Sequence, residues 1–432
     1  MAALFLRFKY QFKKLAKKIL KNVLSLLPEA TAEKIWTGLI GRYHLYRLYG
    51  LLAVFRSVFK SRQERQDIRN FESEMSALPK EKTCIIIESS MLWDAELFQR
   101  PQQLALAFSR LGCLVIYKQN YLAGSVQRFS PDLWVVDASH ATGPEKAYRF
   151  LFSTYNYLPD LFRHRSESDF IVYEYIDHID EKISGSSDVL IKLSANKKNM
   201  FANANIITAS AQVLYEEAVS AAHGQVLLLP NGVDTDHYFS FSRKELPPKK
   251  MQHFCERYKG KIVGFFGAMA PWLDYALINQ LIRQRKDLGF VFIGPDYGDS
   301  LHKLNQAENC LSLGFVDYFV LPDYALWFDI CWIPFEAGDI AKATSPLKLF
   351  EYFAMGKPVV VASDMCECVR FEQVHKGSTP ESYSAAFDLA LEQALLPATA
   401  TELKKLALEN SWLARAQAFL DATSSMYNCN NQ

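Results

Sequence analysis

The chain has 432 residues, of which 50% are hydrophobic and 22% charged, and its formal net charge is +1. At roughly 150 residues per domain, this length allows two or three folded domains, and the composition excludes a disordered chain. The eight cysteines form no Cys-x-x-Cys pair, and the Cys366–Cys368 spacing is a weak metal signal, so we expect reduced thiols and no metal site. Lysines interrupt the early apolar runs and no apolar run reaches 18 residues, so we expect neither a signal peptide nor a transmembrane helix.

Positive charge is concentrated at the start of the chain, where residues 1–65 hold 14 Lys and Arg against three acidic residues. In residues 1–27, apolar side chains recur at helical spacing opposite a row of lysines, which is typical of an amphipathic helix at a membrane surface. We therefore expect residues 1–80 to form a basic helical segment, with residues 1–65 contacting an anionic membrane surface. The alternative is a helix packed on its own domain. Aromatic residues and arginines interleave over 34–62, but no nucleic-acid motif is present and we expect no nucleic-acid partner.

Strand and helix patterns alternate from residue 82 onward. Short apolar strands are predicted at 83–87, 113–117, 133–139, 169–177 and 204–210, with helical stretches between most of them. This alternation is typical of a doubly wound parallel sheet. We therefore expect residues 81–240 to form a Rossmann-like domain, followed by a polar, proline-containing linker at 242–253.

The same pattern restarts after the linker. Strands ending in turns are predicted at 261–270, 290–296, 330–336 and 358–363, so a second Rossmann-like domain is expected over 255–400. Residues 401–432 are predicted to form a C-terminal helix that crosses back to the N-terminal domain. The expected fold class is α/β, with two doubly wound domains facing a cleft, and ligands of such sheets bind beyond the carboxyl ends of the strands.

The segment 343–364 carries strong helix signals. Ser345 and Pro346 suit the N-cap and the first helical position, and Gly356 suits a helix end. Three apolar residues share one face and are expected to pack in the core: Leu347, Phe350 and Ala354.

The other face of this helix carries Lys348, Glu351 and Tyr352. A helix N-terminus with a lysine suits a phosphate group, and a carboxylate can accept hydrogen bonds from both hydroxyls of a ribose. One helix could therefore hold a diphosphate at its tip and a ribose one turn further along. The alternative is a solvated Lys348–Glu351 pair, which would contribute about 0.2–0.5 kcal/mol.

The motif "SPLKLFEYFAMGKPVV" (345–360) resembles the C-terminal domain of GT-B glycosyltransferases of the family 4-like, group 1 type. The resemblance extends over roughly residues 82–425. Its other motifs are "NGVD" (231–234), "GFFGAMAPWLD" (264–274), "FIGPD" (292–296), "LGFVDYFVLPDYALWFDICWIPF" (313–335) and "NSWLARAQAFL" (410–420). It implies a nucleoside diphosphate sugar as co-substrate, with no bound metal or other cofactor.

The resemblance also implies roles for individual residues. Glu351 would hold the ribose, backbone near Val316 would meet the base, and Gly267 would permit close approach of the donor. Gly294 and Gly314 are expected to serve turns. The full set of implied donor-binding residues is Gly267, Phe315, Val316, Ser345, Leu347, Lys348 and Glu351.

One position departs from the family pattern. Many retaining members carry a second glutamate eight residues before the ribose glutamate, and this chain has Ala343 there, which weakly favours an inverting reaction. Inversion needs a general base, and Asp94 in the loop after the first strand is the first candidate. The competing carboxylates are Glu88, Glu96, Asp177 and Asp180. On the acceptor side we place Arg100 and Asp177.

Together these features predict a cytoplasmic glycosyltransferase of polysaccharide biosynthesis that is peripheral on the inner face of the cell membrane. It would move a sugar from a nucleoside diphosphate sugar to a lipid-linked or surface-glycan acceptor. Two alternatives stay open: a GT-B-fold sugar-nucleotide epimerase or hydrolase, and a non-catalytic GT-B-like scaffold that binds a membrane or a partner.

Overall fold

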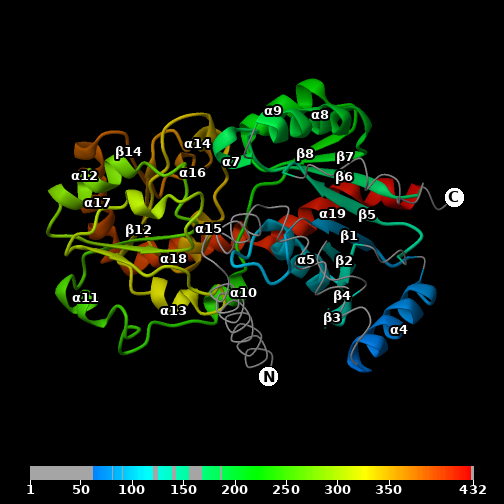
Figure 1. The fold of residues 1–432 in the computed structure, drawn as a ribbon, viewed down its shortest axis with the longest axis horizontal. Helices are drawn as coiled ribbons and strands as arrows, with labels where there is room; N and C mark the ends of the chain where they lie inside the picture. The colour runs from blue at the N-terminus through cyan, green and yellow to red at the C-terminus, as the bar shows by residue number, and fades with distance from the viewer. Residues whose placement is uncertain are drawn as a thin grey trace, which may run out of the picture.

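The computed structural model describes residues 62–79, 81–89, 91–119, 125–138, 143–154, 168–184 and 187–429. The predicted amphipathic helix at 1–27 and nearly all of the basic segment 1–65 lie outside the described residues. The described chain folds into two α/β domains that lie side by side (Figure 1). The expected fold class, two doubly wound domains, is therefore confirmed.

The N-terminal domain is built on an eight-stranded sheet. Its spatial order is β3 (Val126–Ser130), β4 (Leu133–Asp137), β2 (Leu114–Gln119), β1 (Cys84–Ser89), β5 (Tyr148–Phe152), β6 (Phe170–Tyr175), β7 (Ile206–Ala209) and β8 (Gln225–Leu228). Only the β3–β4 pair is antiparallel. The strand order reverses at β1, whose neighbours are β2 and β5, and this reversal is the switch point of a doubly wound sheet.

Helices cover this sheet on both faces. They are α4 (Arg62–Ser76), α5 (Arg100–Arg110), α7 (Glu181–Ser184), α8 (Ser187–Asn203) and α9 (Gln212–Ala221). Residues of α4 were expected to belong to the membrane-associating segment, but its buried Phe71 packs edge-on against Trp134 of β4. The described part of that segment therefore belongs to the N-terminal domain.

The C-terminal domain is built on a six-stranded, fully parallel sheet. Its order is β11 (Cys310–Ser312), β10 (Gly289–Ile293), β9 (Ile262–Phe266), β12 (Ile330–Ile333), β13 (Val359–Ala362) and β14 (Val374–Gly377). Its helices are α10 (Thr235–Phe239), α11 (Gln252–Arg257), α12 (Tyr275–Gln284), the 3-10 turn η1 (Leu301–Lys303), α13 (Leu321–Ala325), α14 (Asp339–Ala343), α15 (Leu347–Ala354), α16 (Cys366–Val369), α17 (Pro380–Ala394) and α18 (Pro397–Glu409).

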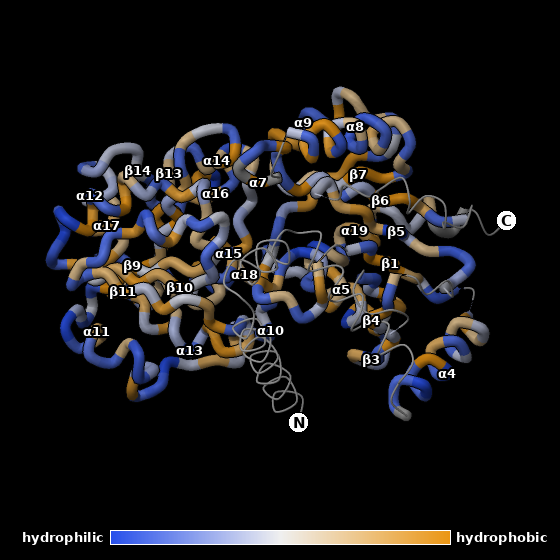
Figure 2. Tube along the Cα trace, in the orientation of Figure 1, coloured by the Kyte–Doolittle hydropathy of each residue, from blue (hydrophilic) through white to orange (hydrophobic). Residues whose placement is uncertain are grey.

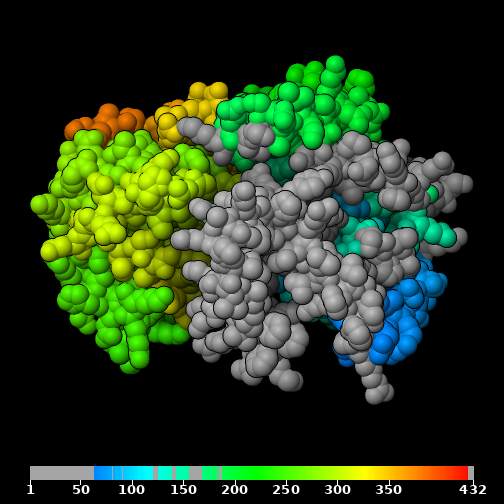
Figure 3. Space-filling model, viewed as in Figure 1, coloured from blue at the N-terminus to red at the C-terminus, as the bar shows by residue number. Residues whose placement is uncertain are grey.

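The central strands of both sheets are apolar because helices cover them on both sides. Strands such as β9, β10 and β12 are buried along their whole length, as expected of parallel sheets. Figure 2 shows these strands as hydrophobic tracks inside each domain, with more hydrophilic helices outside. The surfaces of α9 and α14, which come from different domains, adjoin at the top of the molecule (Figure 3).

The described part of the chain crosses between the domains twice. The first crossing, residues 231–234, is paired with the second, residues 410–412, through Val233 N–H to the Asn410 carbonyl at 3.2 Å and Trp412 N–H to the Val233 carbonyl at 3.0 Å. Tyr238 of α10 already packs in the C-terminal core, so this core begins before the expected residue 255. The last helix, α19 (Trp412–Cys429), returns to the N-terminal domain and packs on α5.

The hydropathy of the helices bears on membrane topology. Among the helices that the structure describes, none is both long enough and apolar enough to cross a membrane.

Candidate active site

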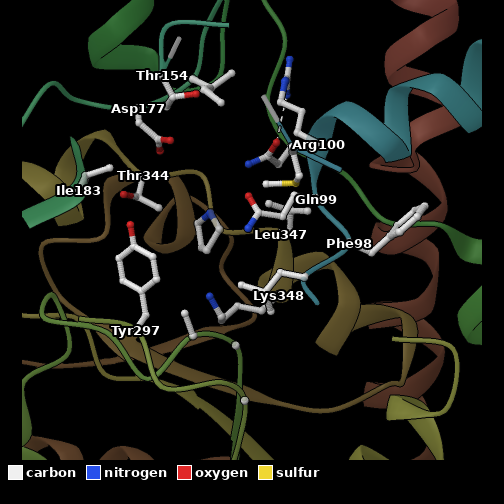
Figure 4. Close-up of a pocket in the computed structure, with 18 of the residues that line it drawn as sticks. Phe98, Gln99, Arg100, Thr154, Asp177, Ile183, Tyr297, Thr344, Leu347 and Lys348 are labelled. Carbon is white, nitrogen blue, oxygen red and sulfur yellow. Dashed lines mark hydrogen bonds between the residues drawn. The ribbon is translucent and has the colours of Figure 1, made fainter. Parts of the chain in front are cut away.

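A cavity of about 630 Å³ lies between the two domains. One wall comes from the loop after β1, the start of α5 and the segments after β5 and β6. The other wall comes from the turns after β9, β10 and β12 and from the start of α15. Most of these segments follow the carboxyl ends of parallel strands, which is where doubly wound sheets bind ligands. Figure 4 shows Lys348 on one side of this cavity and Arg100 and Asp177 on the other.

Lys348 brings an ammonium group into the cavity. Its Nζ lies 5.4 Å from the ring centroids of both Phe265 and Phe335. It forms no salt bridge with any residue that the structure describes. Burial lowers the pKa of this ammonium, and the Glu351 carboxyl offsets part of that effect. An anionic ligand would supply a counter-charge and favour the cationic form.

Glu351 lies one turn after Lys348 on α15, is 7% exposed and lines the same cavity. Burial raises the pKa of its carboxyl to about 7, while the Tyr238 hydroxyl and the Lys348 ammonium lower it in part. When ionised, this group only accepts hydrogen bonds. The diol of a ribose would supply the donors that it needs.

The start of α15 differs from the sequence prediction. The helix begins at Leu347, Pro346 occupies the N-cap position, and no side chain caps the helix. The Ser345 hydroxyl instead accepts a hydrogen bond from Asn231 N–H at 3.3 Å, and the Asn231 amide donates to the Ser345 carbonyl. The predicted Ser345 cap was wrong because this buried side chain is used to join the first crossing to α15. The helix N-terminus is thereby left without a side-chain cap, beside the cavity.

Arg100 is a buried cation on the N-terminal wall, only 2% exposed. Its Nε donates to Glu174, and its Nη1 donates to the Asn231 side-chain oxygen at 3.1 Å. Glu174 also accepts from the Thr208 hydroxyl at 2.6 Å. The Nη2 group has no hydrogen-bond partner among the described residues. Because an unpaired buried donor is costly, this group is suited to an anionic or hydroxyl group of a ligand.

Asp177 follows β6 and also lines the cavity. Burial raises the pKa of its carboxyl to about 7, and the nearby Arg100 guanidinium offsets part of the rise. A cavity carboxyl that titrates near neutral pH is typical of a general base. Asp94, the first candidate from the sequence, is exposed and does not line the cavity. The geometry therefore favours Asp177 over Asp94.

Two glycines hold the turns of the C-terminal wall close together. Gly267 and Gly294 have φ values of +138° and +156°. A Cβ on Gly267 would lie 2.8 Å from Lys348 Cε, and a Cβ on Gly294 would lie 1.7 Å from the Gly267 carbonyl oxygen. A side chain at Gly267 would therefore press on the ammonium stem. Gly314, with φ +65°, has no atom near its missing Cβ and serves its turn through backbone conformation alone.

The remaining predicted residues divide into those that line the cavity and those that do not. Val316 and Leu347 line it, whereas Phe315 does not. Of the competing carboxylates, Glu96 lines it from an exposed position, while Glu88 is buried in an ion pair with Arg149. Asp180 is outside the lining.

Tyr352 also differs from its expected place beside Lys348 and Glu351. It is fully buried, and its hydroxyl accepts a hydrogen bond from Phe266 N–H at 3.1 Å. Its ring packs edge-on against Phe266 at 4.7 Å. Tyr352 therefore belongs to the core of the C-terminal domain, because its side chain points from α15 towards β9 and not into the cavity.

Ala343, where many retaining relatives carry a glutamate, does not line the cavity. It is 3% exposed and packs in an apolar cluster of the N-terminal domain with residues such as Ala209 and Ala211. The neighbouring Thr344 and Ile340 line the cavity instead. This chain therefore places no carboxylate from position 343 near a bound donor.

Several cavity residues were not singled out from the sequence: Asn231, Trp272, Tyr297 and Thr344. Asn231 stood within the quoted "NGVD" motif, which was its only signal. Trp272 and Tyr297 come from two different turns, and their meeting depends on how those turns pack. In the described ranges, no group of three or more His, Cys, Asp or Glu residues is arranged to hold a metal ion.

Two doubly wound domains facing a cavity between the carboxyl ends of their strands define a protein of the GT-B fold. Residues 260–395 match the family described as "Glycosyl transferases group 1". The C-terminal domain is similar to that family, and the chain is a glycosyltransferase.

Comparison with a bacterial sequence agrees with this assignment. The chain is 28% identical over 282 residues to TuaH of Bacillus subtilis, a protein assigned as a teichuronic acid biosynthesis glycosyltransferase. The match covers 62% of this chain and 68% of TuaH.

Solved structures share the fold at low sequence identity. Sucrose-phosphate synthase of Thermosynechococcus elongatus has a TM-score of 0.62 at 13% identity, covering 81% of this chain and 100% of that one. A trehalose-6-phosphate protein of E. coli with bound UDP-2-fluoro glucose has a TM-score of 0.60 at 10% identity, covering 80% and 99%. HepE of Anabaena, solved with UDP and glucose, has a TM-score of 0.55 at 14% identity, covering 79% and 100%.

Proposed function

We propose that this glycosyltransferase transfers a sugar from a nucleoside diphosphate sugar to a lipid-linked or surface-glycan acceptor, with inversion at the anomeric carbon. The observation that carries the donor assignment is the arrangement on α15. Lys348 and Glu351, one turn apart, face one cavity beside a helix N-terminus that no side chain caps.

The donor would bind with its diphosphate at the start of α15 and its ribose at Glu351. The ammonium of Lys348 and the N–H groups of the first turn supply positive charge for the diphosphate. The same charge would stabilise the diphosphate as it leaves, so that the donor domain assists departure without a resident metal. UDP is the first nucleotide to test, because structural neighbours were solved with UDP or a UDP-sugar.

The acceptor would bind against the N-terminal wall. Asp177 would take the proton of the acceptor hydroxyl as that oxygen forms a bond to the anomeric carbon and the bond to the diphosphate breaks. The Nη2 of Arg100 would bind a phosphate or carboxylate of the acceptor. Inversion follows from direct displacement and agrees with the packing of Ala343 away from the cavity.

The N-terminal wall also favours an acceptor with an apolar part. Its lining includes the aliphatic side chains Met91, Leu97, Ile176, Ile183, Val189 and Leu193. Such a surface, next to one buried arginine, suits a lipid phosphate better than a free sugar. The basic residues 1–65 would hold the enzyme at an anionic membrane surface on the cytoplasmic side, where such an acceptor is found.

The decisive experiment measures transfer from UDP-sugars to lipid-linked acceptors extracted from membranes, with wild type and Asp177→Asn. We expect wild type to form product and Asp177→Asn to lose about 100-fold or more in kcat, the usual contribution of a general base. The anomeric configuration of the product, read by NMR coupling constants, tests inversion. A product with retained configuration would reject the base assignment.

The two alternatives predict different results. An epimerase or hydrolase would consume the UDP-sugar at the same rate with and without the lipid acceptor. A scaffold would bind vesicles yet consume no donor. Co-sedimentation with anionic vesicles, comparing the full chain with one lacking residues 1–61, tests the membrane assignment separately, and equal binding would contradict it.

A further inference from the structure

Trp272 and Tyr297 form an aromatic pair in the cavity that the proposed donor and acceptor contacts do not use. Trp272 belongs to the turn after β9 and Tyr297 to the turn after β10. Their ring centroids are 5.5 Å apart at an interplanar angle of 51°, and both side chains line the cavity. Tyr297 is 40% exposed, so part of its ring is left uncovered by protein.

The backbone fixes where this pair stands. Tyr297 N–H donates to the Met269 carbonyl, and Met269 N–H donates to the Pro295 carbonyl, each at 2.9 Å. The Asp296 carboxylate accepts from Ser300 N–H at 2.8 Å and closes the turn. These bonds join the backbones of the two turns and so place the two aromatic residues next to each other.

The position of the tyrosine hydroxyl adds a polar contact. In Figure 4 it points from the C-terminal wall towards the side of the cavity drawn with Thr344, Ile183 and Asp177. No residue that the structure describes forms a side-chain hydrogen bond with it. The cavity thus combines an exposed ring, a hydroxyl with no side-chain partner among the described residues and, across the opening, the Asp177 carboxyl, whose pKa burial raises to about 7.

We propose that Trp272 and Tyr297 form a binding subsite for a sugar ring, carried either by the donor or by the acceptor. A pyranose has an apolar C–H face, which packs on an aromatic ring, and a rim of hydroxyl groups, which hydrogen-bond to the Tyr297 hydroxyl and Thr344. The subsite places that ring between the diphosphate site on α15 and Asp177. This inference rests on the proposed function because it assumes that a nucleoside diphosphate occupies the α15 site.

The test separates the nucleotide from the sugar. Calorimetry measures the affinity of wild type, Tyr297→Ala, Tyr297→Phe and Trp272→Ala for UDP, UDP-glucose, UDP-galactose and UDP-glucuronate. Saturation-transfer NMR then measures binding of methyl glucoside and methyl galactoside with UDP present. Phe129→Ala is the matched control, because Phe129 is 42% exposed but lies on β3, outside the cavity.

If the ring belongs to the donor, Tyr297→Ala and Trp272→Ala will weaken UDP-sugar binding about three- to tenfold, the usual range for an aromatic contact, and leave UDP unchanged. If it belongs to the acceptor, UDP-sugar affinity will stay constant and the methyl glycoside signal will fall. Tyr297→Phe keeps the aromatic ring, so in either case it should lose less sugar binding than Tyr297→Ala does. If the variants bind UDP normally and show unchanged affinity both for the UDP-sugars and for the methyl glycosides, the subsite is wrong. If wild type binds no nucleoside diphosphate, the proposed function is wrong instead.

Discussion

Replacing Lys348 by methionine tests the donor site most directly, because this substitution removes the charge and keeps most of the aliphatic stem. The ammonium lies over the rings of Phe265 and Phe335 without a salt bridge to any described residue. A bound diphosphate would supply its ionic partner. Hydrogen bonds to charged groups contribute about 1.5–3 kcal/mol, so Lys348→Met should weaken UDP binding roughly 10- to 150-fold.

The same substitution should affect the stability of the free protein in the opposite direction. Burial lowers the pKa of Lys348, which means that folding disfavours its charged form at all pH values below the unfolded pKa of about 10.4. Removing the charge relieves this cost. The free variant should therefore unfold at a higher urea concentration than wild type at pH 7.

The assay compares UDP with uridine by calorimetry. Lys348→Met should weaken the binding of UDP and leave the binding of uridine unchanged, because uridine has no diphosphate. Lys342→Met is the matched control, because Lys342 lies on α14, is exposed and pairs with Asp339 at 3.5 Å. Equal losses for UDP and uridine, or wild-type affinity for UDP, would refute a diphosphate at the start of α15.

Three further changes test other parts of the site. Glu351→Ala should weaken the binding of UDP about tenfold or more, because the ribose hydroxyls would lose the carboxylate that accepts their hydrogen bonds. The binding of 2′-deoxy-UDP should be less affected, since it lacks one of these hydroxyls, and equal losses for both nucleotides would contradict the ribose contact. The kcat of wild type should rise with pH through about 7, as Asp177 loses its proton, and a profile that is flat from pH 5 to 8 would exclude it as the base. Gly294→Ala should cost more than 3 kcal/mol of unfolding free energy in urea, since its Cβ would lie 1.7 Å from the Gly267 carbonyl oxygen; a loss below 1 kcal/mol would show that the two turns separate easily.

The sequence was sufficient for the fold class because both sheets are made of apolar strands with strong periodic helices between them. Strand β3 was not predicted from the sequence. Its pattern of one buried residue, three exposed and one half-buried gives neither an apolar run nor clear alternation, as befits an antiparallel edge strand. Strand β8 is at the other edge of the sheet and is only half-buried along its length.

The centre of the proposed donor site could be predicted from the sequence because Lys348 and Glu351 lie within one helix. Spacing alone places Lys348 and Glu351 one turn apart on α15. On the proposed acceptor side, Arg100 and Asp177 were named from the sequence, but they come from separate segments, and only the fold shows that they line one cavity. The choice between Asp94 and Asp177 depended on which loop turns into the cavity, and local spacing carries no information about that.

The return of α19 to the N-terminal domain has a consequence for biosynthesis. Phe419 is fully buried and packs against Phe108, Tyr148 and Phe150, and the Tyr148 hydroxyl donates to the Thr423 carbonyl at 2.8 Å. The N-terminal domain thus lacks part of its core until residues 412–423 have been made. The C-terminal sheet can close earlier, so the second domain in sequence is the first that can finish folding. A truncation just before Trp412 would leave both sheets intact in sequence but an aromatic surface of the N-terminal domain uncovered.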